Sequence, residues 1–221
     1  FQHQDQAAFE LLVRRYGSMV FGVCQRLLRN THDTEDAFQA VFLVVVHKGR
    51  SLLGRETIGN WLYGVSYHTA LKARANVLQR RFKESQVPAK SPDQPNTEGL
   101  WPELRPLLDQ ELSKLPDRFR EAVVLCDLLG KSRKEAAQQL NIREGTLSSR
   151  LATARRKLAA RLTQLGVTLS GGGMAFGVAQ NSTAATVPTH LLVKTVQVSN
   201  AVATGALKLT ADLVSPTVVA L

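Results

Sequence analysis

Residues 132–155 decide the fold, and they read SRKEAAQQLNIREGTLSSRLATAR. Ser132, followed three residues later by Glu135, is the signature of a capping box and predicts a short helix over residues 132–139. Asn141 tolerates the left-handed backbone conformation, so a tight turn follows this helix. A second helix comes next, because apolar side chains then recur at helical spacing. These apolar positions are Leu147, Leu151, Ala154, Leu158, Leu162 and Leu165.

A short helix, an Asn-containing turn and a longer basic helix form the layout of a helix-turn-helix, in which the second helix enters the major groove of DNA N-terminus first. A further helix over residues 115–125, with Pro116 in its first turn, precedes the motif. The small side chains of Ala136 and Ala137 at the expected helix crossing favour DNA binding over a three-helix bundle with a solvated surface. The second helix directs its first polar side chains toward base edges and its later basic side chains toward phosphates. The first group is Glu144, Thr146, Ser148, Ser149 and Arg150, and the second is Arg155, Arg156 and Lys157.

The charge of the chain is distributed in blocks. The 221 residues carry a net charge of +10, and only 6% of them are aromatic. Residues 1–85 hold 12 basic and 7 acidic side chains, residues 112–166 hold 12 and 5, and residues 86–111 between them hold 2 and 5. Clustered Lys and Arg gain affinity for nucleic acid by releasing counterions from phosphates. The sequence therefore predicts an all-α protein with two small basic helical domains, 1–85 and 112–166.

The connector and the tail differ from both domains. Residues 86–111 contain five prolines, which remove backbone donors and disfavour helix, so we expect an extended, mobile linker there. Residues 167–221 carry almost no charge, and Ser, Thr, Asn, Gln and Gly dilute their apolar side chains too much for a membrane span. The part from Pro188 onward predicts a weakly amphipathic helix, docked on the two domains or on a missing continuation of the chain. The role of the tail is left open.

Three helices are predicted in the first domain. The first spans residues 5–28, the second opens at Glu35 and is followed by a loop from Gly49 to Gly54, and the third begins after Thr57. Basic side chains gather toward the end of the third helix, where they suit either a nucleic acid or a solvated helix C-terminus. Trp61, Tyr63 and Tyr67 among them are placed to stack on unpaired bases or to fill the core.

No enzyme is expected, because the sequence lacks a phosphate-cradling glycine loop, a metal-ligand cluster and a credible catalytic set. No cofactor and no metal are therefore predicted. Cys24 and Cys126 stand in apolar stretches without ligand-spaced partners, which predicts buried free thiols and a reducing, cytoplasmic compartment. The first residues lack the basic-then-apolar shape of a signal peptide.

At these motifs the sequence resembles the extracytoplasmic-function sigma factors of bacterial RNA polymerase. Residues 132–155 resemble their region 4, residues 33–42 (DTEDAFQAVF) resemble region 2.2, and the helix from Trp61 resembles regions 2.3–2.4. Both basic blocks are covered in the right order across a linker of suitable length. Residues 64–74 (GVSYHTALKAR) look most like planctomycete members, which often carry C-terminal extensions.

The resemblance implies a dissociable polymerase subunit that binds the core enzyme and promoter DNA, and it admits an anti-sigma factor as a further partner. It implies docking on the clamp of the largest core subunit through Glu35, Asp36, Gln39 and Phe42. It implies melting of the −10 element with Trp61, Lys72, Arg74, Arg80 and Arg81. It implies recognition of the −35 element by Glu144, Thr146, Ser148, Ser149, Arg150, Arg155 and Arg156.

The alternative function is a stand-alone helix-turn-helix repressor or activator. It would bind a palindromic operator tightly without polymerase, although the sequence shows no dimerisation heptads.

Overall fold

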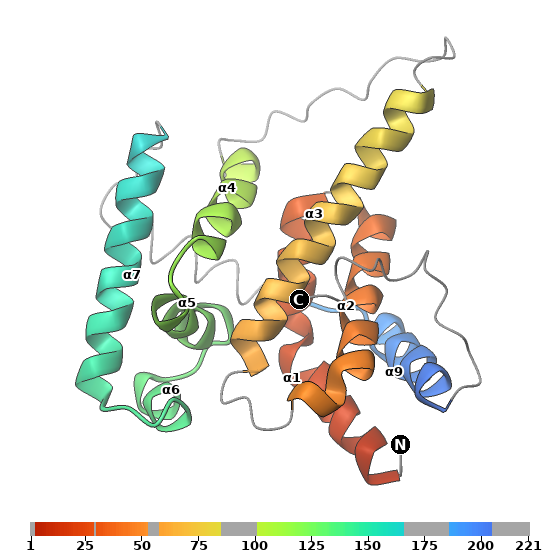
Figure 1. Cartoon of the computed structure of the whole chain (residues 1–221), viewed down its shortest axis with the longest axis horizontal. Coiled ribbons are helices and arrows are strands. Elements are labelled where there is room, and N and C mark those ends of the chain that lie inside the picture. The colour runs from red at the N-terminus through yellow and green to blue at the C-terminus, as the bar shows by residue number, and fades with distance from the viewer. Residues whose placement is uncertain (1–2, 29, 53–57, 85–100, 166–185, 205–221) are drawn as a thin grey trace.

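A computed structural model of the chain describes residues 3–28, 30–52, 58–84, 101–165 and 186–204. Every regular element within these ranges is a helix, which confirms the predicted all-α class. The helices form two packed groups, and a last helix lies against the first group (Figure 1).

The first group, here called the first lobe, consists of α1 (His3–Leu28), α2 (Thr31–Leu52) and α3 (Ile58–Glu84). Asn30 starts α2, because its side-chain Oδ1 accepts the backbone N–H of His32 at 2.8 Å. The second helix therefore begins before Glu35, where it was predicted to open. It also continues past Gly49 into the predicted loop, since one glycine costs a packed helix only about 1 kcal/mol.

An aromatic cluster fills the space between α1 and α2. The Phe38 ring lies 5.9 Å from that of Phe21 and 5.0 Å from that of Phe42, in edge-on arrangements. Phe9 closes the cluster at 6.2 Å from Phe42. These rings anchor the two helices, since edge-to-face aromatic pairs contribute about 0.5–1.5 kcal/mol beyond their buried area.

The second group, here called the second lobe, holds the helix-turn-helix. Its elements are α4 (Trp101–Ser113), α5 (Asp117–Val123), the π-helical turn η1 (Val124–Leu128), α6 (Arg133–Gln139) and α7 (Glu144–Gln164). The predicted capping box is confirmed, because Ser132 and Glu135 each accept a backbone N–H of the other. Asn141 has a φ of 49°, as predicted. The predicted apolar stripe of α7 is buried except for Leu165, which follows the helix and is 53% exposed.

The prediction of an extended linker over residues 86–111 is wrong from residue 101 onward, where α4 forms. Pro102 lies in the first turn, where a missing N–H costs nothing, and only Pro106 stands inside the helix. An interior proline costs about 3 kcal/mol. Apolar burial of Leu112 helps to offset this cost, and Asp109 is held by its ion pair with Arg26 of α1. Residues 85–100 of the predicted linker lie outside the described part of the chain.

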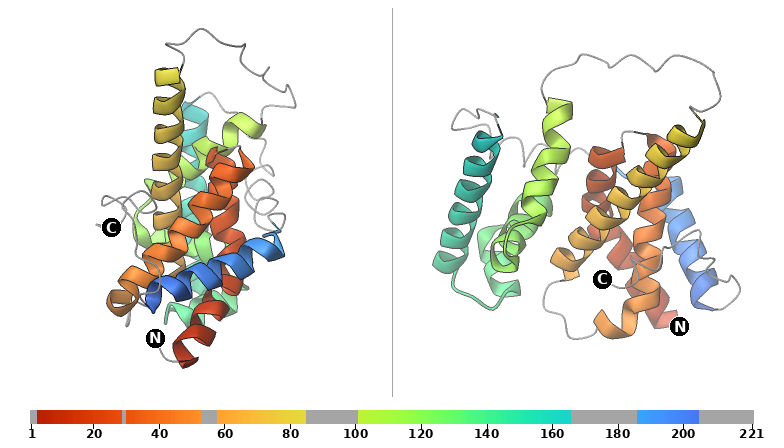
Figure 2. Two further views of the ribbon diagram at one scale, coloured as in Figure 1. Left: turned by 90° about the vertical axis from the view of Figure 1, so that its right-hand side faces the viewer. Right: turned by 45° about the horizontal axis from the view of Figure 1, so that its top comes forward.

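The predicted tail helix is present as α9 (Thr189–Ala203). It packs on α2 and α1 of the first lobe, which is one of the docking surfaces that the sequence left open. Figure 2 shows α9 crossing the first lobe on the side away from the second lobe. Leu191, Thr195 and Ser199, spaced one turn apart, form its buried face.

Candidate nucleic-acid interface

Helix α7 lies at the outer edge of the second lobe, with α4, α5 and α6 on its inner side (Figure 1). Leu147 and Leu151 fix its inner face in the core. The side chains predicted to meet DNA therefore emerge on the remaining surface. Glu144, Thr146, Ser149 and Arg156 are exposed, and Ser148 and Arg150 are half-buried. The first two turns of the helix thus present polar groups outward, as a recognition helix requires.

Arg155 is only partly exposed and is paired within the lobe, so its contact with DNA stays a prediction. Its Nη2 donates to Asp127 Oδ1 at 2.6 Å and its Nε to Oδ2 at 3.3 Å, tying α7 to η1. This hydrogen bond and the charge of Asp127, opposed by partial burial, raise the pKa of Arg155 above its ordinary value. The neighbouring Arg156 is exposed, so it is the better candidate for a phosphate contact.

Sequence reasoning missed the start of α6. Arg133 and Lys134 are exposed on its first turn. In a helix-turn-helix the first helix crosses the DNA backbone, so cations at this end are candidates for phosphate contacts. The signal was present in the sequence, as two basic residues directly after the Ser132 cap.

Helix α3 presents only part of its predicted DNA-binding set. Trp61 and Lys72 are half-buried, and at about 100° per residue they lie on one side of the helix. Arg74 is exposed, but its position two residues beyond Lys72 places it about 200° further around the helix. The side chains of Arg80 and Arg81 lie outside the described part of the chain. Trp61 and Lys72 thus share a face of the helix, about 16 Å apart along its axis, and Arg74 does not share it.

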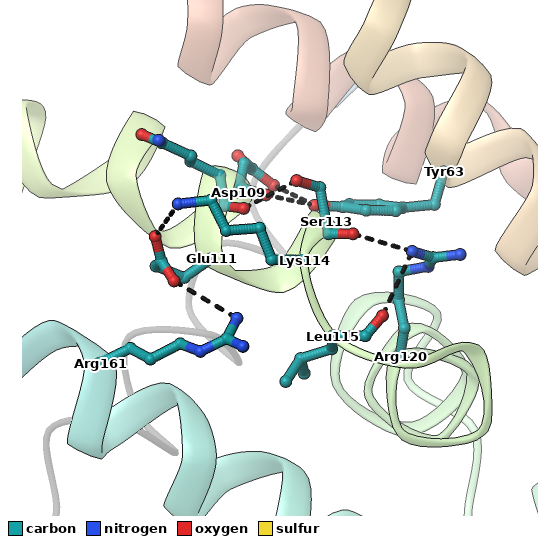
Figure 3. Close-up of polar contacts among 9 residues, drawn as sticks. Tyr63, Asp109, Glu111, Ser113, Lys114, Leu115, Arg120 and Arg161 are labelled. Atoms are coloured by element: carbon teal, nitrogen blue, oxygen red, sulfur yellow. Dashed lines mark hydrogen bonds and ion pairs between the residues drawn. The ribbon is translucent and has the colours of Figure 1, made fainter.

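Tyr63 is fully buried, so it fills the core instead of stacking on bases. Its hydroxyl lies 3.2 Å from Asp109 Oδ1 and 3.1 Å from the Asp109 carbonyl oxygen (Figure 3). Burial and the nearby Asp109 charge hold the pKa of Tyr63 well above its ordinary range, so the hydroxyl stays a donor. Tyr67 is also buried, at 6% exposure.

Asp109 lies at the centre of the contact between the lobes. It accepts two hydrogen bonds from Arg26 of α1, at 2.6 and 2.9 Å. A second contact joins Arg120 of α5 to Asn60 of α3, where Nε donates to Oδ1 at 2.8 Å. Gly59 provides room for this approach, because a Cβ there would lie 3.1 Å from Leu129. The first half of α3 is therefore covered by the second lobe.

Arg120 and Glu111 organise the second lobe itself around this contact (Figure 3). Arg120 Nη1 donates to the carbonyl oxygen of Ser113 at 3.0 Å, bracing the turn between α4 and α5. Glu111 accepts from Lys114 at 2.6 Å and approaches Arg161 of α7 at 3.5 Å. The charged side chains of Glu111 and Arg120 thus hold α4 against α5 and α7.

The start of α2 carries the side chains predicted to bind the polymerase core. Asp36 is exposed, and Glu35 and Gln39 are half-buried. Phe42 is fully buried in the aromatic cluster, so the prediction that it contacts the core enzyme is corrected to a packing role. Nε2 of His190 on α9 lies 3.7 Å from Glu35 Oε1.

Two further properties, the capacity to cross a membrane and to bind a metal ion, concern the described residues alone. None of these helices combines the length and apolar character needed to cross a bilayer. Within the same ranges, no three His, Cys, Asp or Glu side chains are grouped to hold a metal ion. Cys24 is buried, and this burial raises its pKa to about 12; Cys126 is half-buried.

Comparison with known proteins identifies both lobes. Residues 12–80 match the family described as Sigma-70 region 2, and residues 105–158, which begin within α4, match Sigma-70, region 4. The chain is 33% identical over 166 residues to the ECF RNA polymerase sigma factor SigE of Mycolicibacterium smegmatis, covering 70% of this chain and 62% of that protein. The chain thus spans less than two thirds of the length of this relative.

Two further similarities cover more of the matched protein. The ECF RNA polymerase sigma-E factor of Haemophilus influenzae is 27% identical over 176 residues, covering 74% of this chain and 92% of that protein. A solved structure of the sigma factor RpoE with the anti-sigma factor NepR from Bartonella quintana matches with a TM-score of 0.30 and 20% identity, over 75% of this chain and 97% of that one. With region 2 and region 4 present in order and ECF sigma factors among its relatives, the chain belongs to the extracytoplasmic-function sigma factors.

Proposed function

We propose that this chain binds the RNA polymerase core and directs promoter-specific initiation, with the first lobe melting the −10 element and the second lobe reading the −35 element. The observation that carries the proposal is the pairing, in one chain, of a sigma region 2 and a region 4 whose recognition helix presents its polar N-terminal turns outward. Sigma factors are not enzymes. We propose that the chain acts in the cytoplasm, where the polymerase and its DNA template are found.

Helix α7 is proposed to read the −35 duplex in the major groove. Thr146, Ser149 and Arg150 stand on its first turns, where side chains reach base edges. A bidentate pair between an arginine and a guanine contributes about 1–3 kcal/mol of discrimination against the wrong base. Glu144 and Ser148 complete the polar set. Arg156, Lys157 and the two cations at the start of α6 are proposed to contact phosphates, which fix the register of the helix on DNA.

Helix α3 is proposed to hold the −10 element. Trp61 and Lys72 share one side of the helix, so an aromatic ring and a cation can act on the same strand. Stacking of an unpaired base contributes about 1–3 kcal/mol, which is comparable to the few kcal/mol that extruding a base costs. Arg74, Arg80 and Arg81 would add charge along the helix toward its C-terminal end.

The carboxylates at the start of α2 are proposed to meet the clamp of the core enzyme. Glu35 and Asp36 suit an arginine-rich partner, because charge-assisted hydrogen bonds between arginine and carboxylate are roughly twice as strong as neutral ones. Gln39, one turn after Glu35, extends the same surface. An anti-sigma factor is a further proposed partner of these lobes.

The described arrangement of the lobes must open for this function. Positions −10 and −35 are separated by about 25 base pairs, which is about 85 Å of B-form DNA at 3.4 Å per base pair. Each lobe of some 65 residues is about 30 Å across, and the two are in direct contact through Arg26 and Asp109. Lobes in contact cannot reach both elements, so the described arrangement is the closed, unengaged form.

Run-off transcription with core polymerase on promoter fragments tests the proposal. We expect specific transcripts only when the chain is added, and weak binding of the chain alone to promoter duplex. Arg150→Ala should reduce −35-dependent initiation while core binding persists, and Arg118→Ala, which changes an exposed arginine on α5, is the matched control. Specific transcription that ignores the chain, or a strong palindromic footprint of the chain without polymerase, would support the stand-alone regulator instead.

A further inference from the structure

Helix α9 occupies the seam between α1 and α2 of the first lobe. Leu191 is fully buried there, and the Leu192 side chain passes close to α1. The segment that contains α9 comes close to α1 at Gly17, because a Cβ built on this glycine would lie 3.5 Å from Leu192 and 3.7 Å from Val187. The tail is thus seated on the lobe through apolar contacts that a larger residue at Gly17 would disturb.

The first turn of α9 lies beside the surface proposed to bind the polymerase core. Nε2 of His190 is 3.7 Å from Oε1 of Glu35, and the side chain of Glu35 is only 23% exposed. The same α9 turn carries Leu191 into the contact with the lobe. A partner that bonds to Glu35 from the solvent side must therefore displace this turn or share its space.

The contact is built so that it can be released. Only one aliphatic side chain of α9, Leu191, is fully buried among the described residues, and the next two positions along the seam are Thr195 and Ser199. The Thr195 hydroxyl is satisfied within its own helix, where Oγ1 donates to the Leu191 carbonyl oxygen at 2.7 Å. A groove of about 180 Å³ remains between α1 and α9, lined by Val13 and Val196 among others. This groove opens to solvent, so α9 makes fewer dispersion contacts with α1 than a closely packed helix would.

From these contacts we infer that α9 is an intramolecular competitor of the polymerase core for the start of α2. This inference rests on the proposed function, because it takes the α2 surface to be the core-binding surface. When α9 is docked, only the undocked fraction of molecules binds the core, and the apparent dissociation constant rises by the inverse of that fraction. A chain that is nine-tenths docked would bind the core about tenfold more weakly than one whose α9 is released.

The test measures core binding by the full-length chain and two matched variants. Leu191→Asp places a charge at a fully buried position and should release α9. Lys194→Gln makes the same change of one unit in net charge on the same helix, at an exposed side chain that does not line the groove, so docking should persist. We expect Leu191→Asp to bind core polymerase about tenfold more tightly than the unchanged chain, and Lys194→Gln to bind as the unchanged chain does. Equal affinity of all three proteins would overturn the inference while leaving the proposed function intact.

A second measurement needs no substitution. Hydrogen exchange of the α9 amides in the unchanged chain is compared with and without core polymerase. We expect the amides of residues 189–203 to lose protection when the core binds, because α9 is displaced. Unchanged protection in the complex would overturn the inference even if Leu191→Asp failed to fold. Absence of core binding by every protein, the unchanged chain included, would instead reject the proposed function.

Discussion

Arg26 and Asp109 form a bidentate ion pair between the two lobes although they stand 83 positions apart in the chain. Their side chains are 7% and 2% exposed. Burial alone would lower the pKa of Arg26, but the adjacent Asp109 carboxylate more than offsets it, so the net shift is upward. Arg26 therefore stays charged in the closed form and depends on Asp109 as its partner.

Asp109→Ala should open the lobes. The substitution leaves Arg26 buried without its partner, a situation that typically costs about 3–5 kcal/mol, and separation of the lobes returns the guanidinium to water. We expect energy transfer between dyes at Gln79 and Gln164 to fall, while helix content by circular dichroism is retained. The double variant Arg26→Met with Asp109→Leu is the control, because an apolar pair avoids the unpaired charge. Persistent closure of Asp109→Ala would show that apolar contacts alone hold the lobes.

Acidification should weaken the same closed form through His68. Burial and, to a lesser degree, repulsion from Arg120 of the second lobe lower the pKa of His68 below its ordinary 6.5. Opening removes the repulsion from Arg120, so His68 has a higher pKa in the open form, which then binds more protons than the closed form; closure is therefore fully supported above about pH 6.5 and weakens as the pH falls. We expect the dye-pair signal to shift toward the open form as the pH falls below about 6.5. His68→Gln should remove this part of the pH dependence, and an unchanged profile in that variant would exclude His68 as its source.

Arg155 and Arg156 should behave differently although they are adjacent. Arg155→Ala leaves the buried carboxylate of Asp127 without this partner, and we expect a loss of about 1.5–3 kcal/mol in the free energy of unfolding. Arg156→Ala removes an exposed cation, so the free energy of unfolding should not change. The slope of the logarithm of DNA affinity against the logarithm of salt concentration should decrease in magnitude by about 1. Urea unfolding and binding titrations of the holoenzyme check both. Equal changes in unfolding free energy and in salt dependence for the two variants would mean that the contact between Arg155 and Asp127 does not persist in solution.

Phe42 and Glu35 should likewise separate packing from binding. Phe42→Ala removes a fully buried ring from the aromatic cluster and should cost about 3–5 kcal/mol of stability. Glu35→Gln changes a partly exposed carboxylate, so we expect unaltered thermal unfolding and weaker core binding. Glu10→Gln, on α1 at the groove beside α9 and paired with Arg14, is a charge-matched control for the second variant. Normal core binding by Glu35→Gln would remove this carboxylate from the proposed interface.

The sequence by itself determined the elements whose causes are local. The capping box of Ser132 and Glu135, the left-handed Asn141 and the apolar stripe of α7 are all found as predicted, because each depends on residues within a few positions of one another. The resemblance to region 4 was likewise recognised from residues 132–155. A helix-turn-helix could therefore be recognised before any tertiary contact was known.

The tertiary structure alone decided which side chains are available. Helix α4 was missed because Pro106 disfavours it locally, whereas its Asp109 is paired with Arg26, which stands 83 positions away in the chain. Arg155 and Phe42 matched motif positions, but their contacts with Asp127 and the phenylalanine cluster give both of them a packing role. Periodicity records which face of a helix is apolar, whereas the partner that covers that face, as α1 and α2 do for α9, depends on free energies of long-range contact.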